Sequence, residues 1–275
     1  MADVMIRPAA ASRPAWLTAA LQVGLPAVTL VLMLAVIFWI RPTAMSYFGF
    51  TLLFKLATPL VFAALAQMLI IMLGDIDLSN GAFVGLITCI TALNLDTNPL
   101  LAVVLYLATI AVYAGIGLLI HLRQLPSIIV TLGMSFIWLG TAIIVLPSPG
   151  GSAPAWLAGF MSWRPPFVPL PILLAVIAAA VGHMVITRSS YGAVLRGAGA
   201  NPRAIERAGW STTRIRVLVY AAAGVLACLA GVTRLREQNA RSKRAARSIV
   251  AEADLNPFPG RNRPTHRKKG PARQS

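Results

Sequence analysis

The sequence predicts an all-α integral membrane protein whose helices cross the bilayer several times. Of its 275 residues, 57% are hydrophobic and 12% are charged, and the mean hydropathy is +0.75. Soluble domains carry about 25% charged residues, so this composition belongs to the membrane class. The apolar residues also come in long runs, and about 20 of them are enough for one helical crossing.

The apolar runs define about six full membrane spans and one shorter helix. No small-residue cleavage site follows the first run, so we expect it to remain as the first helix of a polytopic bundle. The short run at 81–93 has too few residues for a straight crossing, and its length is typical of a broken or re-entrant helix. The six full spans are expected at 19–40, 50–73, 99–120, 126–146, 167–187 and 215–232.

Positive charges divide unequally between the two sides of these spans. Up to Val232, Arg41 and Arg164 fall on one side and nine arginines on the other, with Lys55 set aside near the end of a span. Because cytoplasmic loops carry the excess of Lys and Arg, the side with nine is expected to be cytoplasmic, together with the N-terminal segment 1–18. The nine are Arg7, Arg13, Arg123, Arg188, Arg196, Arg203, Arg207, Arg214 and Arg216.

The polar loop at 187–216 contains a short helix with recognisable ends. Asn201 is a suitable N-cap, Pro202 fits the first helical position and Gly209 fits the position just after the end. A helix of about two turns is not stable alone in water, so the protein or a partner must hold it. The plain alternative is a solvated loop whose arginines only fix the topology. The exposed side of the helix carries Arg203, Glu206 and Arg207.

Two carboxylates, Asp75 and Asp77, lie between apolar segments of membrane length. An acid at the centre of a bilayer costs roughly 2.5–3.5 kcal/mol on insertion scales, so it normally faces a partner or a cavity. Asp77 or Ser79 can cap the short helix that follows, since the first turn of a helix has free N–H groups. Capping does not account for Asp75, which is therefore the stronger functional candidate.

Four stretches resemble, in order, segments of the ABC transporter permeases of the ribose, xylose and galactose type. The first is Gly-Asp-Ile-Asp-Leu-Ser at 74–79, which is similar to the Gly-Ile-Asp-Leu-Ser signature of those permeases. The others are 125–134, 191–210 and 214–232. The resemblance covers most of the chain from about Ala57 to Val232, and four motifs in order at consistent spacing are specific.

The resemblance implies a permease domain at 19–232 that carries a monosaccharide or related solute across the inner membrane. It also implies a second permease copy, an extracytoplasmic solute-binding protein and a separate ABC ATPase subunit that binds a coupling loop at 188–214. No Walker-type phosphate loop occurs in the sequence, so ATP hydrolysis is expected in the partner. Asp75, Asp77 and Ser79 would then shape the translocation path. An ion-coupled secondary transporter or channel is the rival interpretation, because intramembrane carboxylates also suit ion coupling.

Other chemistry finds little support in the sequence. Cys89 and Cys228 lie far apart in apolar segments, without the spacing of a disulfide framework or a metal site. We therefore expect small core residues at both positions, no metal and no cofactor. The spans are expected to be surrounded by membrane lipid. Nucleic acid is not an expected partner, because the basic tail holds one aromatic residue, Phe258.

The segment 233–275 departs from the pattern of the family, which continues with further apolar helices. It carries twelve Lys or Arg and three acids, and it lacks a helical or strand periodicity. We expect it to be disordered. Two explanations stay open: a genuine basic extension that binds anionic lipid, or an out-of-frame reading of the last helices. The second is favoured, because the topology would place these charges outside, and it would leave the chain without activity.

Nucleotide sequence tests the out-of-frame explanation directly. A shifted reading frame just after the codons for 230–232 should restore apolar stretches of about 20 residues, the length of a membrane crossing. Sequencing the gene and translating all frames is the measurement. If no downstream frame encodes apolar helices, the tail is a real cationic segment, and protease protection in sealed vesicles then locates its side of the membrane.

Overall fold

A computed structural model describes residues 15–147, 154, 156, 157, 159 and 170–255. Within them the side chains of 15–23, 171 and 235–255 are not described. Every regular element in this part of the chain is helical, which confirms the predicted all-α class. The elements are α1 (Ala15–Ile40), η1 (Pro42–Met45), α2 (Tyr47–Met72), α3 (Asn80–Asn94), α4 (Pro99–Arg123), α5 (Ser127–Val145), α7 (Leu170–His183), η2 (Met184–Arg188), α8 (Ser190–Ala200), α9 (Pro202–Arg207) and α10 (Thr212–Leu255).

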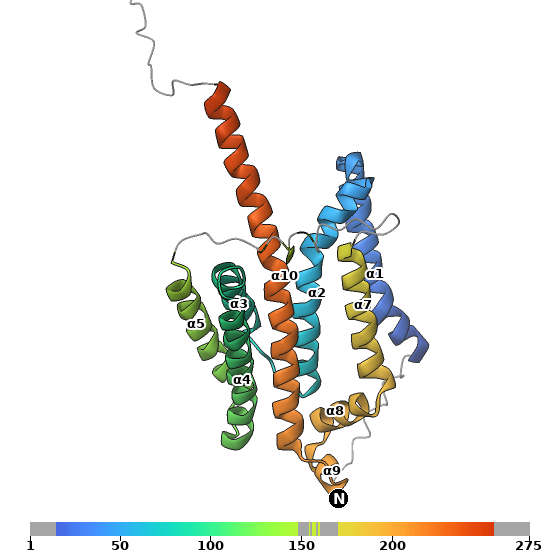
Figure 1. The fold of residues 1–275 in the computed structure, drawn as a ribbon. Helices are drawn as coiled ribbons and strands as arrows, with labels where there is room; N and C mark the ends of the chain where they lie inside the picture. Colours follow the sequence, from blue (N-terminus) through green and yellow to red (C-terminus); the bar gives the residue numbers. More distant parts are fainter. Residues whose placement is uncertain (1–14, 148–153, 155, 158, 160–169, 256–275) are drawn as a thin grey trace, which may run out of the picture.

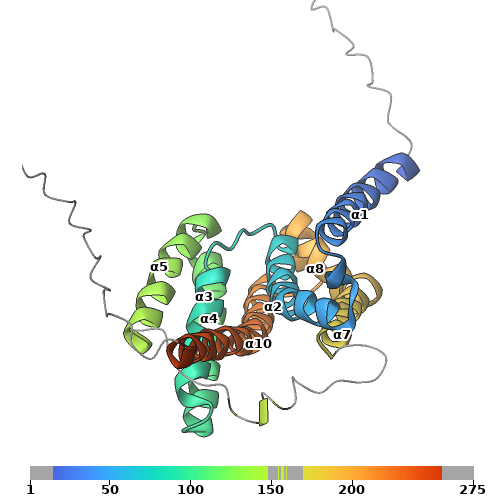
Figure 2. The ribbon, with the colours of Figure 1, turned by 90° about the horizontal axis from the view of Figure 1, so that it is seen from above.

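Helix α10 is the axis of the bundle, and α2, α3 and α4 all pack against it. Helix α5 packs on α3, and α7 packs on α2. Figure 1 shows these helices running side by side, with α8 and α9 gathered beneath one end of α10, and Figure 2 shows the bundle from above. The two short helices therefore cap one end of the bundle and lie across the direction of its long helices.

Within the residues that the structure describes, fewer full spans are found than the six that the sequence predicts. Four helices in the described residues are long and apolar enough to cross a membrane, and a bent pair formed by 172–188 and 190–200 gives a fifth if it counts as one span. The short helix predicted at 81–93 is confirmed as α3. The first and fifth predicted spans are not among the four, and both are only partly described. In α1 (Ala15–Ile40) the side chains of 15–23 are not described, which leaves the apolar helix Gly24–Ile40, and the fifth predicted span falls on α7 (Leu170–His183) and η2.

The predicted change of structure after Val232 is wrong for the first part of the tail. Helix α10 continues without a break to Leu255. Residues 233–255 contain neither Gly nor Pro and are rich in Ala and Arg, both of which have high helix propensity. A helix therefore forms here without an apolar stripe, because the helix propensity of the individual residues does not depend on a periodic pattern of apolar residues. The predicted disorder of 256–275 lies outside the described residues.

The helices approach closely because small residues lie at their contacts. A Cβ at Gly231 of α10 would lie 2.6 Å from Ile87 of α3, and a Cβ at Gly117 of α4 would lie 2.7 Å from the ring of Tyr220 on α10. Lipid tails are as apolar as leucine, so helices in a bilayer associate through packing and hydrogen bonds. The outward surface is accordingly apolar, as Leu60 at 69% and Ile144 at 81% exposure illustrate.

The contact at Gly117 can be tested against Gly115, which lies two residues earlier on the same helix and has nothing within 4 Å of an added Cβ. Gly117→Ala should lower the free energy of unfolding by about 1–3 kcal/mol, the usual cost of overpacking. Gly115→Ala should be neutral or stabilise by up to about 1 kcal/mol through helix propensity. Thermal unfolding in detergent micelles measures both, and equal midpoints for the two variants would contradict the packing assignment.

Candidate functional site

Helix α2 ends in a turn that directs the chain back into the bundle. Gly74 adopts a left-handed conformation with φ of 79°. Its N–H donates to the carbonyl of Ile71 at 2.9 Å, and the N–H of Asp75 donates to the carbonyl of Ile70 at 3.3 Å. These two bonds form a Schellman motif, in which glycine is preferred because the left-handed residue has no Cβ. The motif fixes where Asp75 leaves the end of α2.

The segment 75–79 then runs with side chains alternating between inside and outside. Asp75, Asp77 and Ser79 are buried, whereas Ile76 and Leu78 are 46% and 47% exposed. Polar residues therefore point into the bundle and apolar residues point out, the reverse of a soluble protein. This arrangement fits a lipid environment, where carboxylates need partners inside the protein.

Helix α5 supplies the hydrogen bonds that this irregular backbone needs. The N–H of Ile76 donates to Ser127 Oγ at 3.1 Å, and the N–H of Leu78 donates to Thr131 Oγ1 at 3.1 Å. Thr131 Oγ1 is also 3.3 Å from the carbonyl oxygen of Ile76, as a donor. Non-helical backbone at membrane depth is tolerated only where such partners or water satisfy it. Two short hydroxyl side chains thus replace the missing helical hydrogen bonds.

Asp75 is held by two residues of α10. Its Oδ2 accepts a hydrogen bond from the hydroxyl of Tyr220 at 3.2 Å and lies 3.5 Å from Nη2 of Arg216. The carboxylate sits at the C-terminal end of α2, where the helix dipole is negative, so the arginine offsets an otherwise unfavourable charge. Asp75 therefore ties the end of α2 to the axial helix, a role that capping of α3 could not give it.

Asp77 links the segment 75–79 to α4 and also bonds to Ser79 within the segment. Its Oδ1 accepts hydrogen bonds from the N–H and the hydroxyl of Ser79, both at 2.7 Å, and its Oδ2 accepts the hydroxyl of Tyr113. The expected cap on α3 is wrong for Ser79: this residue occupies the N-cap position, but its side chain makes no capping bond. Its hydroxyl donates to Asp77 instead, because the carboxylate is the stronger acceptor at close range.

Helix α3 begins well inside the bundle. Nδ2 of Asn80, the first residue of α3, donates to the carbonyl of Ala63 at 2.9 Å, beside the middle of α2. The 15 residues of α3 span about 22 Å, less than the roughly 30 Å of a hydrocarbon core. The non-helical segment 75–79 before it adds at most about 16 Å, since a fully extended chain spans about 3.3 Å per residue. Segment and helix together are thus long enough for one crossing.

The short helix predicted in the polar loop is confirmed as α9. Asn201 Oδ1 accepts from the N–H of Ala204 at 3.2 Å, Pro202 opens the helix, and Gly209 follows its end with φ of 86°. None of the residues of α9 is buried. Glu206 is bonded to the start of α10, because its Oε1 accepts the Thr212 hydroxyl at 2.6 Å. Arg203 and Arg207 complete the charged surface of this helix.

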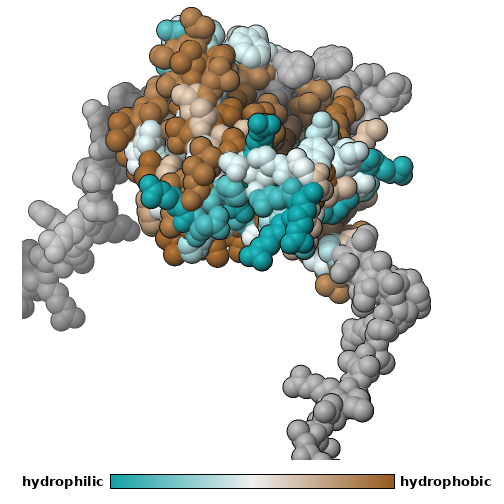
Figure 3. Space-filling view, turned by 90° about the horizontal axis from the view of Figure 1, so that it is seen from below, coloured by the Kyte–Doolittle hydropathy of each residue, from teal (hydrophilic) through white to brown (hydrophobic). Residues whose placement is uncertain are grey.

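Hydrophilic side chains gather on the face of the bundle seen from below in Figure 3, with hydrophobic side chains around them. In Figure 1 this is the end that holds α8 and α9. The two groups of predicted site residues thus occupy different positions. Asp75, Asp77 and Ser79 lie inside the bundle, and Asn201 to Gly209 lie on its end, so the structure does not bring them into one cluster.

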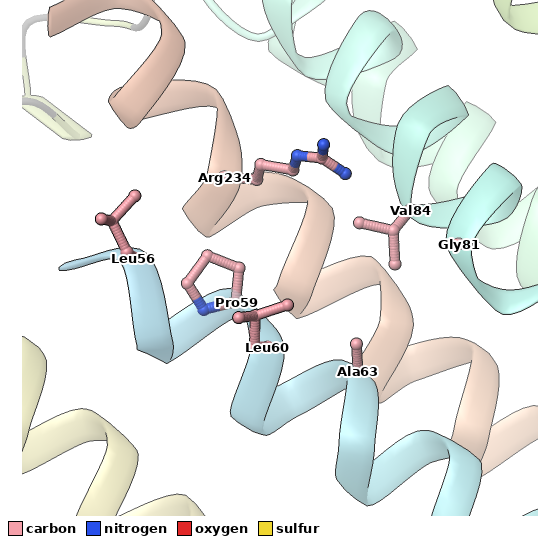
Figure 4. A pocket seen from close by; sticks show the side chains of 7 residues that line it. All are labelled: Leu56, Pro59, Leu60, Ala63, Gly81, Val84 and Arg234. Carbon is pink, nitrogen blue, oxygen red and sulfur yellow. The ribbon is translucent and has the colours of Figure 1, made fainter. Parts of the chain in front are cut away.

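A separate cavity of about 310 Å³ lies between α2, α3 and α10. Figure 4 shows its apolar walls and Arg234, whose side chain extends from α10 toward α3. None of the predicted site residues lines it. Its lining residues are Leu56, Pro59, Leu60, Ala63, Gly81, Val84 and Arg234. In the described residues no group of three or more His, Cys, Asp or Glu side chains could hold a metal ion.

Sequence reasoning missed the aromatic and basic partners of the two acids. Neither Tyr113 nor Tyr220 was predicted as a partner of the acids, although both are fully buried and their ring centroids lie 6.2 Å apart. Arg216 was counted only toward topology. The sequence did contain a usable signal, since a buried acid in a membrane segment requires a hydrogen-bond donor. Tyr113, Tyr220 and Arg216 are among the few residues of the spans that could supply one. Which of them did so depended on the packing of α4 and α10.

An all-helical bundle with an apolar outer surface and inward-turned acids defines a polytopic membrane protein with a buried polar centre. Such a centre is characteristic of proteins that move solutes or ions. The chain belongs to the family described as "Branched-chain amino acid transport system / permease component", which matches residues 49–245. This finding confirms the resemblance to ABC importer permeases. The match extends beyond Val232, where the sequence was expected to depart from the family.

Curated relatives carry the names of importer permeases. The galactofuranose transporter permease protein YtfT of Escherichia coli (strain K12) is 28% identical over 186 residues, covering 64% of this chain and 53% of the relative. The ribose import permease protein RbsC of the same strain is 28% identical over 177 residues, covering 62% and 55%. The autoinducer 2 import system permease protein LsrD of Klebsiella pneumoniae subsp. pneumoniae is 28% identical over 181 residues, covering 62% and 54%.

The chain spans about half the length of the curated relatives that it matches. No solved structure matches it.

The pair formed by Asp75 and Arg216 predicts non-additive effects of substitution. Asp75→Asn and Arg216→Gln should each lower the free energy of unfolding, because each leaves the other charge without its partner in a poorly hydrated place. The double variant should lose less stability than the sum of the two single losses, and the difference, the coupling energy, should be about 0.5–3 kcal/mol. Thermal unfolding in detergent measures the cycle. Strictly additive effects would show that the two side chains do not interact.

Proposed function

We propose that this chain is the membrane-spanning permease subunit of an ABC importer for a monosaccharide or a related small polar solute. The family match over residues 49–245 carries this proposal. Two of the relatives are named for sugars, ribose and galactofuranose, which supports a sugar-like solute over the amino acids in the family description. The chain hydrolyses no ATP in this proposal; a separate ATPase subunit does so.

The 75–79 segment is the part of the proposed translocation path that the chain itself supplies. Asp75, Asp77 and Ser79 support its wall from behind, since their side chains are buried and bonded to α4, α10 and one another. Irregular backbone at this depth is a recurrent feature of solute paths, because it leaves the end of a half-helix inside the membrane. Helix α3, which begins beside the middle of α2, is such a half-helix.

Helix α9 is the proposed contact with the ATPase subunit. Its ends are fixed by Asn201, Pro202 and Gly209, and its bonded Glu206 anchors it to α10. A two-turn helix held this firmly can transmit a push, whereas a loose loop would absorb it. The outward residues Arg203 and Arg207 give it a positive surface that fits an acidic groove. On the opposite side of the membrane, an extracytoplasmic solute-binding protein would deliver the solute.

The remaining partners follow from the same proposal. A second permease copy, identical or different, completes the path, and membrane lipid covers the apolar outer surface. Location in the inner membrane with the N-terminus in the cytoplasm accords with the inside bias of positive charge. The rival function, an ion-coupled secondary transporter or channel, would need no ATPase, so binding to one discriminates between the two. Adjacent genes for an ATPase and a binding protein would be the first indication.

Reversing the charge of α9 tests the coupling. Arg203→Glu with Arg207→Glu should weaken co-purification with the ATPase subunit about tenfold and abolish solute-stimulated hydrolysis, since like charges would then face each other. Arg123→Glu is the matched control, because it is an exposed arginine at the end of α4, outside the loop. Unchanged binding in the double variant, or equal loss in the control, would contradict the assignment of α9.

A further inference from the structure

Helix α8 touches the end of α2 at a place where only glycine fits. A Cβ at Gly199 would lie 2.1 Å from the carbonyl oxygen of Met72 and 3.1 Å from the carbonyl carbon of Leu73. Both contacts are with backbone, which cannot move aside as the tip of a side chain can. Any side chain at 199 must therefore displace either α8 or the end of α2.

The touched end of α2 leads directly to Asp75. Met72 is the last residue of α2, and the Schellman motif of Gly74 joins it rigidly to the carboxylate three residues later. Gly74 itself faces Gly199, since a Cβ at 74 would lie 3.7 Å from the carbonyl oxygen of Gly199. Asp75 then holds Tyr220 and Arg216 of α10. The position of α8 thus fixes the end of α2, and with it the position of Asp75 relative to α10.

On its other side, α8 is joined to α9 without a flexible linker. Asn201 ends α8, because its N–H donates to the carbonyl of Gly197 at 2.8 Å, and it also caps α9 through Ala204. Leu195 and Ala198 of α8 are buried in the main core. Helices α8 and α9 are therefore joined as one unit, and that unit contacts the end of α2 at Gly199.

We propose that Gly199 is a positioning residue that couples the α8–α9 unit to the pair formed by the buried Asp75 and Arg216. A displacement of α9 moves α8, the contact at Gly199 moves the end of α2, and the carboxylate of Asp75 shifts relative to Tyr220 and Arg216. The link itself is a property of this chain. Only its use as a step of transport rests on the function proposed above.

Fluorine spectroscopy can test this link on the chain alone. All five tyrosines are replaced biosynthetically by 3-fluorotyrosine, and each ¹⁹F resonance is assigned by a Tyr→Phe variant. Gly199→Ala should shift the resonance of Tyr220, because its hydrogen bond to Asp75 changes length. The resonance of Tyr106 should not move, since its hydroxyl is bonded to Thr91 of α3, away from the 75–79 segment.

Gly197→Ala is the matched control on the same helix. A Cβ at Gly197 would meet Cδ1 of Ile205 in α9 at 2.7 Å and its Cγ1 at 3.2 Å, and this side chain can rotate away without displacing the backbone of α9. This variant should leave the Tyr220 resonance in place. An unshifted Tyr220 in Gly199→Ala, or an equal shift in both variants, overturns the proposal.

A reciprocal variant covers the case in which Gly199→Ala fails to accumulate in membranes. Coupling between two places is symmetric, so a change at Asp75 must be felt in α8. Asp75→Asn should shift the resonance of Tyr191, which lies in the first turn of α8 against Trp210. Thr91→Val, which removes a buried hydrogen bond between α3 and α4, should not. An unshifted Tyr191 in Asp75→Asn overturns the proposal. These spectra involve no ATPase, so the proposed function can fail or stand separately.

Discussion

The bundle depends on the need to satisfy two carboxylates inside a membrane. Asp75 and Asp77 cannot face lipid without a cost of several kcal/mol, so each must find donors within the protein. Tyr220 and Arg216 of α10 supply them for the first, and Tyr113 of α4 supplies one for the second. The acids therefore draw α2, α4 and α10 together at one level. Apolar packing alone gives little preference for one helix neighbour over another in lipid.

The same need shapes the path of the chain between α2 and α3. Turning the acids inward requires an extended segment with alternating side chains, which puts Ile76 and Leu78 toward the outside. An extended segment lacks its own hydrogen bonds, and Ser127 and Thr131 of α5 replace them. Because α3 is displaced into the bundle as a result, its N-terminus lies beside the middle of α2. One interrupted helix thus follows from two buried charges.

The end of the bundle and its interior are linked by backbone contact, with little contribution from long side chains. Gly199 allows α8 to lie against the last carbonyl groups of α2, where a Cβ would not fit. Such a contact is stiff, since peptide units have fewer ways to yield than side chains. In the proposed coupling, this contact lets the exposed charges of α9 and the buried charge of Asp75 influence each other without touching. Close packing of this kind transmits displacement because protein interiors are poorly compressible.

The sequence by itself determined the membrane class, the short helix α3 and the ends of α9, because hydrophobic length and capping chemistry act over a few neighbouring residues. Asn201, Pro202 and Gly209 were readable for that reason. It misjudged the start of the tail, where helix propensity without periodicity extends α10 to Leu255. Only the tertiary structure decided that Asp75 meets Arg216 and Tyr220, and that Ser79 donates to Asp77 instead of capping α3. Those partners lie up to 145 residues apart in the chain, and the packing of separate helices, which no local pattern encodes, brings them together.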